Sequence, residues 1–424
     1  MSMVEQDEGR PEDMAQRTDI RRVKAGAHPR DRKPLIIKAA REMFAQSGYH
    51  QVGMDEIAAA VGLTGGALYR HFRGKRDLLA RIVFEGLTEI EAVATPENLG
   101  ADADPGQALD TLLGRMAACS LEIREYPVLW QREAPNLSTE ERSELRARLL
   151  AIGRDMSVTI GAVRSDLSPA DLDFLVWANI SMFASPSYHG VKLPRGRFEE
   201  LLYRMGTVLC ATSVLPAGAP PAPTAASANG RGGNGLTARA SRRETLLAAA
   251  IPLFARQGYQ ATTMEDIGRA AGIAGPSIYE HFPSKIDMLV AASMRATERL
   301  ESAFSQALAG ADDPREVLRA VVESHVAQLL EQTDLFSTVI TEIVHLPDAE
   351  RHLLRRIQHD YVSEWVQLLR GLRPDLSETE ARVVTHAVLS LFSDVARMRR
   401  FRNRPGLHTE LVRMGLELLT TETG

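Results

Sequence analysis

The side chains best suited to contact a nucleic acid lie in one short run, residues 64–71, with the sequence TGGALYRH. Small residues come first and permit close approach to a duplex. Tyr69, Arg70 and His71 then offer hydrogen-bonding and basic groups for phosphates and base edges. The pattern favours DNA binding. The candidate DNA-binding residues here are Thr64, Gly65, Gly66, Ala67, Tyr69, Arg70, His71 and Lys75.

Two short helices must position this run. Met54, Ile57 and Val61 recur at the i, i+3, i+7 spacing of one helix face, and Gly62 breaks that pattern. A second apolar face restarts at Leu63 and continues through residues 67 and 72. Two short helices joined by a glycine turn predict a helix-turn-helix. An ordinary helical hairpin in a bundle has the same periodicity, so the spacing alone does not choose between them.

A second copy of the motif decides in favour of the helix-turn-helix. Residues 264–285 repeat residues 54–75 at an offset of 210 without a gap, and 17 of the 41 aligned pairs between Ala39 and Leu79 are identical. A chance hairpin would not recur in this form. The candidate DNA-binding residues of the second copy are Thr263, Gly275, Pro276, Ser277, Tyr279, His281 and Lys285.

Each copy resembles the DNA-binding domain of TetR-type (tetracycline-repressor-like) transcriptional regulators. The resemblance lies in F-A-x-x-G-Y, M-x-x-I-A-x-x-V-G-L and L-Y-x-H-F-x-x-K-x-x-L-L, found at residues 44–49, 54–63 and 68–79 and again, with changes, 210 residues later. It implies an all-α fold of two TetR-like halves. Each half would join an N-terminal three-helix domain to a helical ligand-binding and dimerisation domain. The implied partners are double-stranded operator DNA and a small-molecule effector that releases it.

Length and charge agree with several domains and a local DNA-binding surface. A chain of 424 residues is too long for one core, and its net charge of −5 excludes a general polyanion binder. Residues 17–84 carry a net +8, whereas residues 239–290 carry +1. Cys119 and Cys210 have no CxxC spacing, which indicates a cytoplasmic protein without a zinc module. The longest apolar run, 174–184, is too short to span a membrane.

Changes in amino-acid composition and motif content along the chain predict six segments. These are a disordered basic arm (1–33), a first helix-turn-helix domain (34–84), a first helical ligand domain (85–215), a flexible linker (216–238), a second helix-turn-helix domain (239–292) and a second helical ligand domain (293–424). The arm either reaches the DNA backbone or remains a solvated tail. Glycines at GxGxxG spacing within the linker have no preceding strand, so we do not read them as a dinucleotide site.

The repeat continues beyond the linker at an offset of 209, so the whole protein is duplicated. A 23-residue linker reaches about 75 Å when extended, which lets the two halves pair within one chain. We expect an intramolecular pseudo-dimer. Its interface would be a four-helix bundle of residues 169–184 and 197–214 against residues 379–400 and 408–419. Further homodimerisation stays open.

The two copies differ as DNA readers. Glu280 replaces Arg70, and Pro276 replaces Gly66. A carboxylate facing phosphates lowers affinity, although glutamate accepts a hydrogen bond from cytosine. We therefore expect the first copy to contribute most of the binding energy.

The effector site is harder to locate, because aromatic and methionine side chains also fill helical cores. The candidates are Met116, Tyr126, Trp130, Trp177, Phe183, Tyr188, His189, Phe336, His345, Trp365, His386 and Phe392. Residues 130–146 resemble ligand domains of actinobacterial regulators of lipid metabolism, which implies a lipid-like effector. We expect no metal and no cofactor. Successive members of the set His345, His352 and His359 are about 10 Å apart along a helix, which is too far for them to bind one metal ion. Five arginines at residues 397–404 are expected to stabilise a helix C-terminus, and the alternative is an anionic ligand or an extra phosphate contact.

Two rival functions remain to be weighed. An enzyme is disfavoured by the lack of a nucleophile elbow, metal-ligand cluster or phosphate loop in a valid context. The other rival is a ligand-sensing or protein-interaction module in which one or both DNA-binding domains no longer bind an operator. Tyr69, Arg70 and Lys75 argue against it for the first copy, and less clearly for the second.

Overall fold

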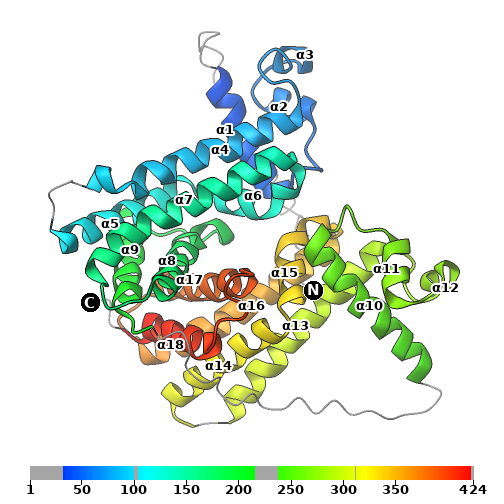
Figure 1. Cartoon of the computed structure of the whole chain (residues 1–424). Helices are drawn as coiled ribbons and strands as arrows, with labels where there is room; N and C mark the ends of the chain where they lie inside the picture. Colours follow the sequence, from blue (N-terminus) through cyan, green and yellow to red (C-terminus); the bar gives the residue numbers. More distant parts are fainter. Residues whose placement is uncertain (1–31, 100–103, 215–236, 311, 422–424) are drawn as a thin grey trace, which may run out of the picture. The chain divides into compact units, whose positions relative to one another are not determined.

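The computed structural model describes residues 32–99, 104–214, 237–310 and 312–421 (Figure 1). Helices are the only regular elements in these ranges, which confirms the predicted all-α fold. The predicted basic arm up to residue 31 and the predicted linker up to residue 236 lie outside the described residues. Contacts divide the chain into two compact units, residues 1–81 and 82–424, and each is described by itself.

The first unit is the first helix-turn-helix domain. It contains α1 (Arg32–Ser47), α2 (Met54–Ala60), α3 (Gly65–Leu68) and the start of α4 (Lys75–Ala94). Its core side chains are fully buried and come from all four helices: Ile36, Phe44, Ile57, Leu68, Leu78 and Leu79. Gly62 links α2 to α3 with a φ of +68°, a left-handed conformation that only glycine adopts at little cost. The apolar spacing and the glycine turn therefore produce the predicted pair of short helices.

The second unit begins within α4 and first forms a helical domain. Its elements are η2 (Pro96–Leu99), α5 (Pro105–Glu122), α6 (Tyr126–Glu133), η3 (Ala134–Asn136), α7 (Thr139–Val163), α8 (Pro169–Phe183), η4 (Ser185–Tyr188) and α9 (Arg195–Ala211). Ser138 and Ser168 cap α7 and α8 through their hydroxyl groups. The predicted interface helices at residues 169–184 and 197–214 agree with the bounds of α8 and α9 to within three residues.

The same order of elements then repeats. The second helix-turn-helix domain contains α10 (Thr237–Gln257), α11 (Met264–Ala271), α12 (Gly275–Tyr279) and the start of α13 (Lys285–Ala309). The second helical domain contains α14 (Pro314–Glu331), α15 (Thr333–Glu342), η5 (Ile343–His345), α16 (Asp348–Leu372), α17 (Glu378–Arg397) and α18 (Leu407–Thr420). Both α7 and α16 have 25 residues, and the offset of 209 holds at both of their ends.

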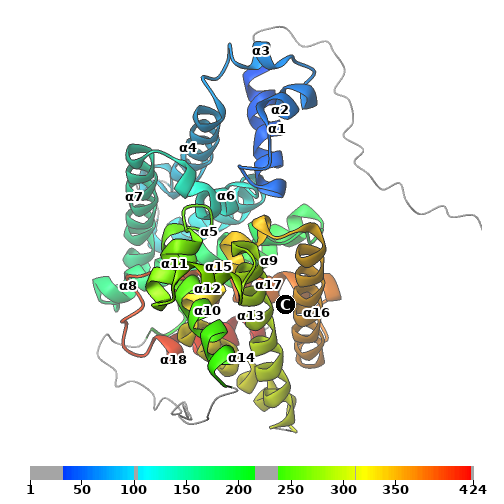
Figure 2. The ribbon, with the colours of Figure 1, turned by 90° about the vertical axis from the view of Figure 1, so that its right-hand side faces the viewer.

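The two helical domains pack against each other through their last helices. Helix α8 lies along α17, and α9 contacts both α17 and α18 (Figures 1 and 2). Helices α8 and α17 are both rich in buried apolar residues, and Phe174 of α8 meets Phe401 of the second half. These are the four helices that the sequence predicts for the interface between halves.

Candidate DNA-binding and effector sites

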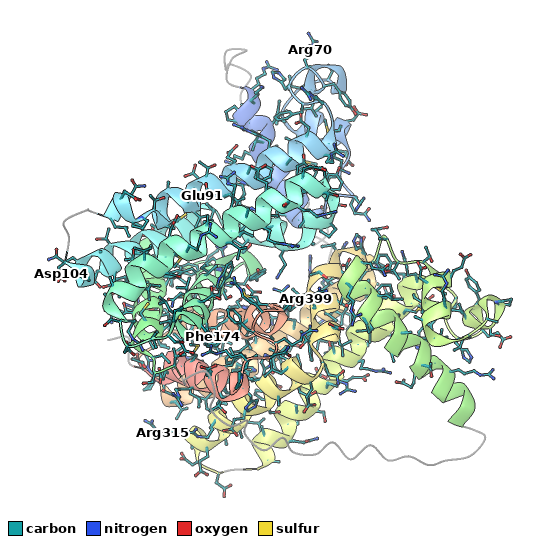
Figure 3. All side chains as sticks on the ribbon, in the orientation of Figure 1. Arg70, Glu91, Asp104, Phe174, Arg315 and Arg399 are labelled. Atoms are coloured by element: carbon teal, nitrogen blue, oxygen red, sulfur yellow. The ribbon has the colours of Figure 1, made fainter. Side chains whose placement is uncertain are left out.

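The first recognition helix presents polar side chains to solvent. Thr64 caps α3 by accepting a hydrogen bond from the backbone N–H of Ala67 at 3.4 Å. Helix α3 ends at Leu68, and Tyr69, Arg70 and His71 occupy the turn that follows it. Tyr69 is 54% exposed, and Arg70 extends away from the domain into solvent (Figure 3). Gly66 is also exposed and leaves space for close approach of a partner.

Two residues that are predicted to contact DNA, Lys75 and Gly65, also stabilise the first helix-turn-helix domain. The Nζ atom of Lys75 lies 4.4 Å from the ring centre of Tyr49 and 3.4 Å from the carbonyl oxygen of His50. A Cβ atom at Gly65 would come within 2.1 Å of a carboxylate oxygen of Asp55. Lys75 therefore fastens α4 to the end of α1, and Gly65 allows α2 and α3 to approach each other.

The second recognition helix has the same backbone and a different surface. Tyr279 is 55% exposed, as its counterpart Tyr69 is, and Gly275 and Pro276 are exposed at the start of α12. Ser277 and His281 are half-buried. Thr263 caps α11 in a reciprocal pair with Asp266, one helix before the recognition helix.

Lys285 is more deeply engaged than Lys75. Its ammonium group donates to the carbonyl oxygens of Tyr259 at 2.6 Å and Thr262 at 2.8 Å, and lies over the ring of Tyr259. Burial lowers the pKa of Lys285 below its usual value. This lysine stabilises the turn before α11, so less of its charge faces solvent.

Sequence reasoning missed two further arginines. Arg73 and Arg76 are exposed beside Arg70 in the first domain, and their counterparts at an offset of 210 are Pro283 and Ile286. The net charges of +8 for residues 17–84 and +1 for residues 239–290 reflect these arginines but do not locate them. The first domain thus presents three arginines where the second has a glutamate, a proline and an isoleucine.

The first helical domain encloses an apolar cavity of about 270 Å³. Five of the seven predicted ligand residues of the first half line it: Met116, Trp130, Trp177, Phe183 and Tyr188. Of the other two, Tyr126 is buried against Gly86, where a Cβ atom would meet its ring at 2.2 Å, and His189 lies outside the cavity. Ile123, Ile152 and Ile180 complete much of the wall.

The polar end of this cavity comes partly from the second half. Asp394 and Arg397 of α17 form an ion pair there, and the Tyr188 hydroxyl group donates to Asp394 at 3.5 Å. The side-chain amide of Gln131 lies against the same pair. Burial raises the pKa of Asp394 above its usual value, although Arg397 favours the charged form.

The equivalent region of the second half is filled by aromatic side chains. At an offset of 209, Met116, Ile152 and Met156 become His325, Tyr361 and Trp365. The Nδ1 atom of His325 lies 2.8 Å from the Tyr361 hydroxyl group, and its ring lies 5.5 Å from that of Trp365. All three side chains are at most 8% exposed. The predicted ligand residues Trp365 and Phe392 belong to this packed cluster, because Phe392 lies 5.9 Å from His325.

The remaining predicted ligand residues of the second half have other surroundings. Phe336 is buried within α15. His386 stacks on His189 at 4.4 Å between centroids, across the contact of the two halves. His345 stacks on Tyr259 beneath the second helix-turn-helix domain and lies 3.5 Å from Glu342. No group of three metal-binding side chains occurs in the described parts of the chain.

Arginines after α17 connect the two halves. Arg404 lies between Asp171 of α8 and Glu410 of α18, at 2.6 Å from each, and all three side chains are at most 7% exposed. Arg400 pairs with Asp173 at 3.0 Å and lies over the ring of Trp177. These internal ion pairs explain much of the arginine cluster at residues 397–404, beyond the effect of a helix C-terminus.

An aromatic contact accompanies the ion pairs. Phe174 of α8, which is labelled in Figure 3, meets Phe401 edge to face, with 5.3 Å between ring centroids. The Arg404 guanidinium lies 4.4 Å from the Phe174 ring. The counterpart of Arg404 in the first half is Arg195, which instead pairs with Glu122 and Glu199 and is 58% exposed. The interface is therefore not symmetric in its ion pairs.

Two short helices joined by a glycine turn, with exposed tyrosine and arginine at the second helix, define a helix-turn-helix DNA-binding transcriptional regulator. The model of "Bacterial regulatory proteins, tetR family" matches residues 36–82 and again residues 246–292. "Tetracyclin repressor-like, C-terminal domain" matches residues 311–397. The chain belongs to the TetR family, as its motifs predict.

Relatives of known function agree with this class. The HTH-type transcriptional activator FasR of Mycolicibacterium smegmatis is 30% identical over 175 residues, which cover 41% of this chain and 79% of FasR. The HTH-type transcriptional repressor KstR2 of the same species is 30% identical over 151 residues, covering 32% of this chain and 70% of KstR2. The crystal structure of the TetR family transcriptional regulator PfmR from Thermus thermophilus matches 43% of this chain and 98% of PfmR, with 28% identity and a TM-score of 0.38. In the described residues, no helix is both long and apolar enough to cross a membrane.

Proposed function

We propose that this regulator reads its operator mainly through the first helix-turn-helix domain. The observation that carries the proposal is the set of exposed arginines at residues 70, 73 and 76, which the second domain replaces by Glu280, Pro283 and Ile286. Arginine supplies both phosphate contacts and bidentate contacts to guanine. The second domain keeps Tyr279 exposed and would add a weaker contact, so we expect an asymmetric operator.

We propose further that the two halves of one chain act as an intramolecular pseudo-dimer with the six segments predicted from the sequence. The buried Arg404–Asp171 pair and the packing of α8 on α17 support this pairing. The protein would then bind one operator as a single chain of 46.6 kDa. Sedimentation of the protein–DNA complex tests this stoichiometry, and two chains per operator would contradict it.

The effector of the proposed regulator is an apolar, lipid-like small molecule that enters the cavity of the first half. The cavity walls are mostly aliphatic and aromatic, and its polar end has only the neutral Gln131 and Tyr188 and the paired Asp394 and Arg397. We propose that the bound effector lowers DNA affinity, so that the protein is a repressor acting in the cytoplasm and not an enzyme. A reporter gene behind the operator distinguishes repression from activation.

The test of the DNA-binding proposal is a comparison of matched variants. Fluorescence anisotropy would measure affinity for DNA taken from upstream of the gene that encodes this chain. Arg70→Ala is expected to weaken binding by about 10- to 100-fold, since a base or phosphate contact of this kind is worth about 1–3 kcal/mol. Ser277→Ala, in the second recognition helix, should change affinity less than about threefold.

Other results would point elsewhere. Equal losses for the two variants would mean that both domains read DNA to the same extent. The absence of salt-dependent binding to every DNA sequence tested would favour the rival function, a sensor in which operator binding has been lost.

A further inference from the structure

A second cavity, of about 570 Å³, lies next to the effector cavity and is lined largely by arginines. Arg256 comes from α10 of the second helix-turn-helix domain, Arg397 from the end of α17, and Arg399 and Arg402 from the turn after it. Thr333, Asp334 and Ser337 of α15 complete the wall, with Ala255. Figure 3 labels Arg399.

Carboxylates of the described residues neutralise only part of the positive charge of this arginine-lined cavity. Arg397 pairs with Asp394, and Arg402 pairs with Asp334 at 3.4 Å. Arg256 and Arg399 are exposed and have no carboxylate within 4 Å in the part of the chain that the structure describes. The N-terminus of α15 adds unpaired backbone N–H groups and a partial positive charge to the same wall.

Arg397 lines both cavities. On one side it meets the apolar space bounded by Trp130 and Trp177, and on the other it faces the arginine-lined cavity. An apolar compartment and a cationic compartment thus share one lining side chain. Their combination matches a molecule with an apolar body and an anionic head.

The arginine-lined cavity belongs to the second half alone. The counterparts of Arg256, Arg399 and Arg402 in the first half are Gln46, Gly190 and Leu193. A cluster required only for folding would be expected in both copies of the duplicated fold. In the second half, the arginine cluster instead lies beside Arg397, which also lines the effector cavity.

We propose that the effector carries a multiply charged, phosphate-type head group, which binds Arg256 and Arg399 while its apolar part occupies the cavity of the first half. This inference rests on the proposed effector cavity. Because Arg256 lies on α10, the bound head group contacts the second helix-turn-helix domain directly. The same bound ligand then contacts the first helical domain, α17 and the second DNA-binding domain.

The probes for this proposal are decyl phosphate and decanol, which share the same apolar chain. Both would be titrated below their aggregation concentrations while the fluorescence of the tryptophans, two of which line the cavity, is followed. Decyl phosphate should bind at least about tenfold more tightly than decanol, in line with charge-assisted hydrogen bonds to arginine. The double variant Arg256→Gln/Arg399→Gln should abolish that difference and leave decanol binding unchanged.

The matched control is Arg315→Gln/Arg319→Gln, which removes two exposed charges from α14. It should preserve the preference for decyl phosphate. Equal affinity of the two probes for the unmodified protein would overturn the head-group proposal and leave the effector cavity standing. If neither probe bound, the proposed effector cavity would fail as well.

A third outcome would reassign the arginines. If Arg256→Gln/Arg399→Gln weakened DNA binding in the absence of any amphiphile, and the control did not, the arginine-lined cavity would be a contact for the operator backbone. That result would also overturn the proposal.

Discussion

The two helical domains share one fold, but their interiors differ. In the first, Met116, Ile152 and Trp177 line an apolar cavity. In the second, His325, Tyr361 and Trp365 pack against one another, with the His325 ring 5.9 Å from the Tyr361 ring. The two helix-turn-helix domains also differ, since the exposed arginines at residues 70, 73 and 76 belong to the first. In the function proposed above, the first half is therefore the sensor and the main DNA reader, and the second half is its packed support.

The largest expected effect is on the free energy of unfolding, at the contact between the two helical domains. Arg404→Ala removes the cation between Asp171 and Glu410 and leaves two carboxylates buried without their partner. The free energy of unfolding should fall by about 3–5 kcal/mol. Urea denaturation measures it. Arg195→Ala, the counterpart in the first half, removes an exposed charge and should cost less than about 1 kcal/mol.

Exchanging core residues between halves tests whether the cavity belongs to the sensor. Met116→His combined with Ile152→Tyr gives the first half two of the residues that fill the second. The tyrosine ring adds volume and the imidazole adds polarity within the apolar cavity, so the fluorescence response to decanol should weaken, at a cost of about 1–3 kcal/mol of stability through changed packing. DNA affinity without effector should stay the same. A retained decanol response would show that the cavity is not the effector site.

Adding a cation to the weaker reader should narrow the difference between the two DNA-binding domains. Glu280→Arg restores the residue type of Arg70 in an exposed position. Operator affinity should rise by about tenfold or less, and the slope of its logarithm against salt should steepen by about one or two. Salt titration by fluorescence anisotropy measures both quantities. Unchanged affinity would mean that the second domain does not touch DNA in the complex.

The smallest effect concerns acid stability. Burial lowers the pKa of His325 to about 3, whereas an unfolded histidine titrates near 6.5. The unfolded chain therefore binds a proton first, so this contribution to stability is complete above pH 6.5 and is lost as the pH falls toward 3. His325→Met, which installs the first-half residue, should reduce the loss between pH 6.5 and 5.5 by about 1 kcal/mol. Identical pH slopes for the two proteins would contradict this.

Much of the fold followed from local patterns. Helix periodicity and the glycine turn predicted the helix-turn-helix domains, and colinear repeats predicted that the four last helices meet. The bounds of α7, α8 and α17 follow from their serine caps. Residue types alone could not distinguish a cavity wall from a core, which is why Trp130 and Trp365 were equal candidates. Their difference depends on side chains from other helices, such as Ile152 and Tyr361.

The arginines show the same limit. Sequence order places Arg397, Arg399, Arg400, Arg402 and Arg404 together at a helix end. Only packing reveals that Arg404 is buried between carboxylates whereas Arg399 faces a cavity. Charge counts distinguish the two helix-turn-helix domains, but they do not identify Arg73 and Arg76 as the positions that differ.

The contact between α8 and α17 joins two segments of a single polypeptide. For a regulator assembled from separate subunits, the active fraction falls as the number of molecules in a cell decreases. Here the covalent link holds the two segments at an effective concentration on the order of millimolar, whatever the expression level. For the proposed intramolecular pseudo-dimer, operator occupancy should therefore vary with the first power of protein abundance, so that a few copies per cell would suffice to regulate.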